Sequence, residues 1–155
     1  MKKTMASVAA VLAGICLAAA AAQNAPHAQN PPLRKAAPAT NASVERGRYL
    51  VEDVAMCGEC HSPRDSEGQL DHSRWLQGAP VWFTPTVMQP DWAYRAPALA
   101  GLPSFTDADM TMVLEKGLQP TGREIRPPMH VFHMNHEDAM AIVAYLRSLP
   151  PNTQQ

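Results

Sequence analysis

The chain has 155 residues, of which 46% are hydrophobic and 17% are charged, and its formal net charge at pH 7 is −1. This length suits one modest domain, and a near-neutral chain without a basic cluster argues against a nucleic-acid-binding surface. We therefore expect no nucleic-acid partner and look for the function in motifs rather than in bulk charge.

The N-terminus has the features of an export signal. Lys2 and Lys3 precede an apolar run over residues 5–22, and three alanines at 20–22 are small enough for a signal peptidase. We expect residues 1–22 to be a signal peptide that directs the protein to the periplasm. The alternative is an uncleaved membrane anchor, because the run approaches the roughly 18–20 residues that a bilayer core requires. Such an anchor is the only membrane contact that we expect.

Residues 23–42 consist mostly of Ala, Pro, Asn and Gln. This composition offers little to bury and predicts a disordered linker. We expect a folded domain over residues 43–150 and a disordered tail over residues 151–155.

The domain is expected to open with a helix from Ser43 to about Met56. Ser43 can serve as its N-cap, Glu45 lies in the first turn, and Tyr49, Leu50, Val54 and Ala55 form part of an apolar face.

The pentapeptide Cys57-Gly-Glu-Cys60-His61 follows at the end of this helix. Two thiols one turn apart can each add to a vinyl group of a porphyrin, and the adjacent imidazole can bind the iron from one face. A zinc site would need four ligands, but the remaining cysteine, Cys16, lies in the N-terminal apolar run. A thioredoxin-like pair would follow a strand, where this sequence predicts a helix. We therefore predict one covalently bound haem c, with Cys57, Cys60 and His61 as its binding residues.

The stretch from Arg64 to Arg95 has little regular periodicity and carries Trp75, Trp82 and Trp92 among prolines and glycines. It predicts a long ordered loop. Long loops usually have a role, and covering a flat hydrophobic cofactor would be one. The alternative is that one or two of these tryptophans belong to the core.

Residues after this loop are candidates to support the cofactor. A ligating imidazole usually donates its second N–H to a carbonyl, and we assign the acceptor role to Pro97, with Leu99 packing on the porphyrin. Arginine pairs well with carboxylates, so the candidates for neutralising the haem propionates are Arg64, Arg95 and Arg126.

Two further helices have clear start and stop signals. Thr106 and Asp109 form a capping-box pattern before an apolar stripe that ends near Gly117. Asn135 caps a last helix with apolar residues at 139, 142, 143 and 146, and Pro150 ends it.

The sixth ligand of the iron distinguishes an electron carrier from an enzyme or sensor. Met129 is the first candidate, because two prolines before it hold the backbone extended and present its thioether. Met134 is the alternative ligand. Three histidines crowd the same region: His130, His133 and His136. One of them could displace the sulfur to give a bis-histidine iron, but we interpret all three as exposed polar positions around a helix start.

Over residues 44–150 the chain resembles class I c-type cytochromes, with a helix ending in CxxCH, a Pro-x-Leu segment, a methionine loop and a terminal helix. The resemblance implies an all-α fold of three main helices around one covalently bound haem, with a long loop insertion after CxxCH. It also implies that the first and last helices cross where Gly47 meets Tyr145. Segments 47–50 and 60–64 are closer to cytochrome units associated with periplasmic alcohol and sugar-acid dehydrogenases.

These features predict a single-electron carrier rather than an enzyme. Its expected partners are periplasmic or membrane-bound redox proteins, such as a dehydrogenase or a terminal oxidase. Two alternatives stay open. One is a five-coordinate haem enzyme or gas sensor in which Met129 does not bind the iron, and the other is a haem subunit held permanently in a dehydrogenase complex.

Overall fold

The computed structural model describes residues 40–151. The expected signal peptide, most of the expected linker and the tail beyond Pro151 lie outside the described residues. Among the described residues, no helix combines the length and apolar character needed to cross a membrane. The elements, in chain order, are α1 (Asn41–Tyr49), the π-helical η1 (Leu50–Val54), α2 (Gly58–His61), the 3-10 turn η2 (His72–Arg74), β1 (Ala79–Pro80), β2 (Arg95–Ala96), α3 (Asp107–Lys116) and α4 (His136–Ser148).

The first helix differs from the sequence prediction at both ends. Its N-cap is Thr40, whose hydroxyl oxygen accepts a hydrogen bond from the backbone N–H of Ser43 at 3.2 Å. Asn41 and Ala42 are therefore helical, although the composition placed them in the linker. At the other end the helix widens into η1 and stops at Val54, because Met56 takes a left-handed backbone conformation with φ of 48°. The prediction erred because both Thr40 and Ser43 are good caps, and local sequence does not choose between them.

The caps predicted for the two later helices are confirmed. The Thr106 hydroxyl and the Asp109 carboxylate form a reciprocal capping box at the start of α3, and Gly117 ends it with φ of 68°. The side-chain oxygen of Asn135 accepts from the backbone N–H of Asp138 at 2.9 Å at the start of α4.

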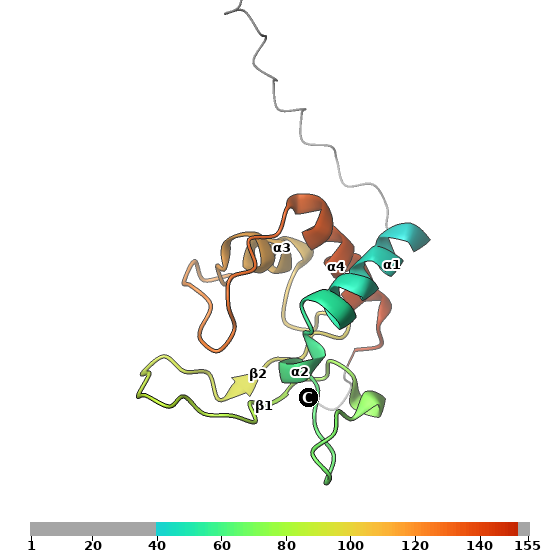
Figure 1. The fold of residues 1–155 in the computed structure, drawn as a ribbon. Helices are drawn as coiled ribbons and strands as arrows, with labels where there is room; N and C mark the ends of the chain where they lie inside the picture. The colour runs from blue at the N-terminus through green and yellow to red at the C-terminus, as the bar shows by residue number, and fades with distance from the viewer. Residues whose placement is uncertain (1–39, 152–155) are drawn as a thin grey trace, which may run out of the picture. The chain divides into compact units, whose positions relative to one another are not determined.

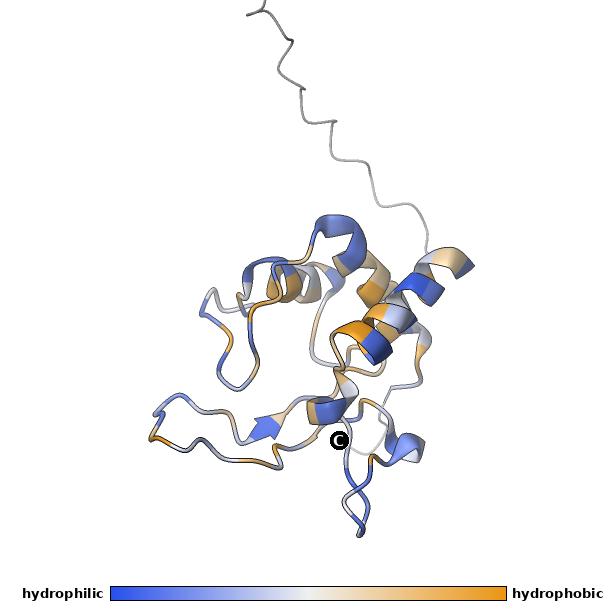
Figure 2. Cartoon of the chain, in the orientation of Figure 1, coloured by the Kyte–Doolittle hydropathy of each residue, from blue (hydrophilic) through white to orange (hydrophobic). Residues whose placement is uncertain are grey.

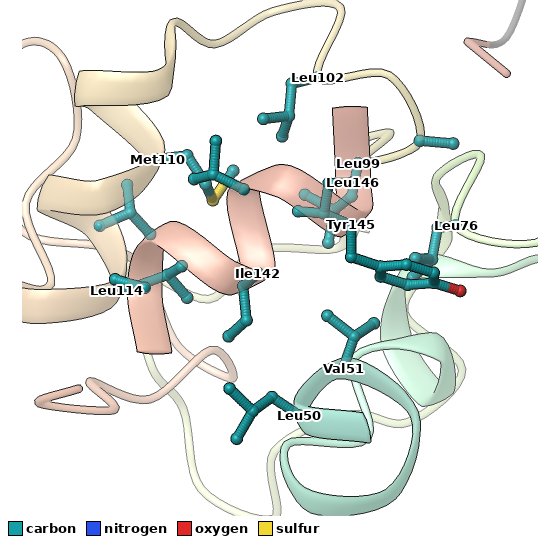
Figure 3. Packing of buried hydrophobic residues seen from close by; sticks show 14 residues of the cluster. Leu50, Val51, Leu76, Leu99, Leu102, Met110, Leu114, Ile142, Tyr145 and Leu146 are labelled. Atoms are coloured by element: carbon teal, nitrogen blue, oxygen red, sulfur yellow. The ribbon is translucent and has the colours of Figure 1, made fainter. Parts of the chain in front are cut away.

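The hydrophobic core is built around α4 (Figure 3). Leu50 and Val51 of η1 pack against α4 from one side, and Met110 and Leu114 of α3 pack against it from another. The crossing of α1 and α4 depends on Gly47, because a Cβ atom there would lie 2.0 Å from the backbone oxygen of Ala141. The crossing implied by the resemblance is therefore present in the structure.

The segment between α2 and α3 contains more regular secondary structure than the ordered loop that the sequence predicts. It contains η2 and an antiparallel pair in which Ala79 lies opposite Ala96 and Pro80 opposite Arg95. Figure 1 shows β1 and β2 at the base of an extended loop, and Figure 2 shows both hydrophobic and hydrophilic positions along it. Trp92 is buried in this segment, whereas Trp82 is 61% exposed.

Candidate functional site

A predominantly apolar cavity of about 330 Å³ lies among α3, α4, β2 and the loop that follows α3. Its lining brings together all six site residues that the sequence predicts, which come from three separate segments: Cys57, Cys60, His61, Pro97, Leu99 and Met129.

The one-turn helix α2 places the CxxCH motif in the wall of this cavity. The backbone N–H of Cys57 donates to Val51 O at 3.0 Å, and the N–H of His61 donates to Cys57 O at 3.0 Å. Both cysteines are free thiols. Burial raises the pKa of the Cys57 thiol to about 11 and also raises the pKa of Cys60. The two thiols therefore stay protonated near neutral pH.

The His61 ring has a fixed orientation. Its Nδ1 donates to the carbonyl oxygen of Pro97 at 2.8 Å, which is the acceptor that the sequence suggests. Burial lowers the pKa of His61, and the hydrogen bond to Pro97 only partly offsets this effect. The ring is therefore a neutral imidazole whose Nε2 is left to bind a metal.

A short network holds the Pro97 carbonyl in place. The backbone N–H of Leu76 donates to the buried Ser62 hydroxyl at 2.9 Å, and Leu76 O accepts from the N–H of Leu99 at 2.8 Å. The N–H of Gly78 donates to His61 O at 2.8 Å. This network ties the segment after CxxCH to the Pro97 segment. The roles of Ser62 and Leu76 in this network could not be predicted from the sequence, because no local motif marks either residue.

The methionine loop is closed at its base and anchored to the β1–β2 hairpin. The backbone N–H of Ile125 donates to Gly117 O at 2.8 Å, and the Arg126 guanidinium donates to Asp91 O and Trp92 O, both at 2.9 Å. These contacts place Met129 in the cavity wall.

The alternative ligands occupy different positions. Met134 packs against the hydrophobic core. It is not one of the described residues that line the cavity. His130 does line the cavity, although it is an exposed residue. His136 lies on the surface, where its Nδ1 is 2.7 Å from a carboxylate oxygen of Glu115.

The three candidate arginines separate into two groups. Arg95 and Arg126 line the cavity. Arg64 instead pairs with Glu59 at 2.6 Å and lies 4.8 Å from the centre of the Trp82 ring. Two of the three candidate arginines therefore line the same cavity as the CxxCH motif.

Most of the remaining wall is apolar. Helix periodicity marked Val113, Leu114, Ile142 and Leu146 as core positions, but it did not show that the same side chains face a cavity. Phe105, Ile125 and Phe132 were missed, because they lie in loops without periodicity.

These residues fit a haem. Two free thiols at CxxC spacing, an oriented neutral imidazole, a thioether and two arginines meet at one apolar cavity. This set offers thioether attachment, two axial ligands and an apolar surrounding for a porphyrin.

Comparisons with known proteins agree with this chemistry. The model of the cytochrome c family matches residues 44–150. The fructose dehydrogenase cytochrome subunit of Gluconobacter japonicus is 33% identical over 121 residues, which cover 74% of this chain and 24% of the relative. A diheme cytochrome c-type protein of Cereibacter sphaeroides is 34% identical over 112 residues, covering 68% of this chain and 35% of the relative.

A third relative is the cytochrome c subunit of an alcohol dehydrogenase (quinone) from Gluconacetobacter polyoxogenes. It is 30% identical over 129 residues, which cover 74% of this chain and 26% of the relative. The chain thus spans about a quarter to a third of the length of these relatives.

Proposed function

This chain belongs to the cytochrome c family, and from that premise we propose that it is a single-electron carrier whose one haem c has His61 and Met129 as axial ligands. One observation carries the proposal. The Nδ1 of His61 is engaged by Pro97 O at 2.8 Å, which leaves Nε2 for the iron in a cavity that Met129 also lines. Cys57 and Cys60 would hold the porphyrin through thioethers. When bound, the haem supplies a reversible Fe(III)/Fe(II) couple.

The surrounding residues favour electron transfer over substrate chemistry. A thioether from Met129 stabilises the ferrous state and raises the reduction potential. Leu99 and the other apolar side chains of the wall would keep water from the iron, and Arg95, which also lines the cavity, would pair with a propionate. In this proposal both axial positions stay occupied, so the chain carries electrons for an oxidoreductase system and is not its catalyst.

We further propose a dehydrogenase as a redox partner and the periplasm as the location. The first proposal is supported by the similarity to cytochrome subunits of fructose and alcohol dehydrogenases. The second is supported by the export-signal features of residues 1–22.

The ligand assignment is tested by visible spectra of the exported protein and two matched variants. We expect the oxidised wild type to show the sulfur-to-iron band near the red edge of the visible range. Met129→Ala should lose this band and Met134→Ala should keep it. Loss of the band in Met134→Ala alone would reassign the sixth ligand.

Two further measurements complete the test. The reduced wild type should resist carbon monoxide, whereas rapid uptake would favour the five-coordinate alternative. Extraction of the denatured protein with acidified acetone should leave the pigment on the chain, and its release would contradict covalent attachment.

A further inference from the structure

A second hollow, of about 470 Å³, lies on the surface beside the CxxCH motif. It is open to solvent between the segment that joins η1 to α2 and the 3-10 turn η2, both below α1 in Figure 1. Met56, Leu70 and Trp75 give it an apolar wall, and Glu52 and Glu59 add two carboxylates.

Met56 separates this hollow from the haem cavity. It is the side chain at the turn between η1 and α2, it lines both spaces, and it is 58% exposed. A group bound in the hollow would therefore lie one side chain away from the cavity.

The carboxylates of the hollow are held in place by neighbouring groups. Glu52 accepts from the Tyr145 hydroxyl at 2.6 Å and pairs with Arg48 at 3.1 Å, and Glu59 pairs with Arg64 at 2.6 Å. Asp53, next to Glu52, is exposed and adds a further negative charge.

The wider charge favours a basic partner. Residues 23–155, which follow the expected signal peptide, carry eleven Arg and Lys against fourteen Asp and Glu, a formal charge of −3. Val54, 50% exposed, and Met56 place apolar surface beside this negative edge. An apolar centre with a charged rim is the usual composition of a transient interface, and opposite charge increases the rate of encounter.

We propose that this hollow is the docking site for a lysine or arginine side chain on the redox partner, an inference that rests on the proposed electron-carrier function. The aliphatic stem of such a side chain would lie against Met56 and Trp75, and its cationic end would meet Glu52 and Glu59. A partner held in this hollow would lie one side chain, Met56, away from the cavity that would hold the haem.

The test uses the haem-loaded protein and two small oxidants of opposite charge. Reduced protein is mixed by stopped flow with tris(phenanthroline)cobalt(III), a cation, or with ferricyanide, an anion. In each case one electron passes from haem Fe(II) to the oxidant metal. The double variant Glu52→Gln/Asp53→Asn removes two charges at the hollow, and the glutamine side chain keeps a carbonyl oxygen as the acceptor for Tyr145. The matched control is Glu124→Gln/Glu137→Gln, which removes two exposed charges elsewhere.

At low ionic strength we expect the hollow variant to react about threefold more slowly, or slower still, with the cobalt complex and faster with ferricyanide. The control should react like the wild type, and the differences should shrink in salt. Equal rates in both double variants, with normal electron transfer, would overturn only the docking site. Failure to reduce either oxidant would overturn the electron-carrier function, and this inference with it.

A second measurement maps the site directly. An oligolysine peptide is titrated into the isotope-labelled protein, and amide shifts are followed by nuclear magnetic resonance. We expect the changes to concentrate at residues 52–59 and 70–75. Changes centred on another acidic region, such as Asp107 and Asp109, or no changes at all, would refute the proposal.

Discussion

Substitution of Gly47 by alanine is the sharpest test of the close crossing of α1 and α4. The added Cβ would lie 2.0 Å from Ala141 O and 2.8 Å from the Cβ of Tyr145. Both neighbours belong to α4, and the closest contact is to its backbone, so no rotation of a flexible side chain can relieve it. The two helices must separate by roughly 1 Å in a core that is otherwise closely packed.

The size of the effect follows from two opposing contributions. Overpacking of this kind costs typically about 1–3 kcal/mol, and a backbone clash favours the upper end. Alanine is preferred over glycine inside a helix by about 1 kcal/mol, which offsets part of the cost. We therefore expect Gly47→Ala to lower the free energy of unfolding by about 2 kcal/mol, or the melting temperature by about 8 °C.

The assay is thermal unfolding of the haem-loaded protein followed by far-ultraviolet circular dichroism. Asn41→Ala is a suitable control, because Asn41 is an exposed residue of the same helix. The control should change the melting temperature by little. An unchanged or higher melting temperature for Gly47→Ala would refute the close crossing of α1 and α4.

Three further predictions concern hydrogen bonds that hold the helices. Tyr145→Phe removes the hydroxyl that donates to Glu52 at 2.6 Å, and we expect a loss of about 1 kcal/mol in urea unfolding. Thr106→Ala removes the cap of α3 and should also cost about 1 kcal/mol. The Thr106 side chain lowers the pKa of Asp109 from its ordinary value of 3.8, so the stability that Asp109 adds is present above that value and is lost as the pH falls through the lowered one. The penalty of Asp109→Asn, measured by urea unfolding, should therefore be full at pH 7 and shrink in acid.

For Tyr145→Phe and Asp109→Asn, the results that would contradict the predictions are as follows. A Tyr145→Phe variant as stable as the wild type would mean that the Glu52 contact adds nothing. A penalty for Asp109→Asn that stays constant down to pH 2 would show that the carboxylate charge is not the stabilising feature.

The parts of this protein whose chemistry is local could be predicted from the amino-acid sequence. The CxxCH motif predicted the attachment residues, and the cap residues Thr106 and Asn135 located α3 and α4. Short-range patterns of this kind carry their own physical cause, because the interacting groups lie within one or two turns of each other. Pro97 could be named as the acceptor for His61 because a ligating imidazole needs a carbonyl, and the structure contains that contact at 2.8 Å.

Contacts between distant segments select which of several equivalent residues takes each position. It selected Thr40 over Ser43 as the first cap and buried Trp92 while leaving Trp82 exposed. It also brought Leu76 to Ser62 and Leu99, and so fixed the carbonyl that orients His61. These outcomes depend on contacts between segments far apart in the chain, and a single residue type does not encode its distant neighbour. The two hollows that share Met56 exist for the same reason, since each is enclosed by segments that only folding brings together.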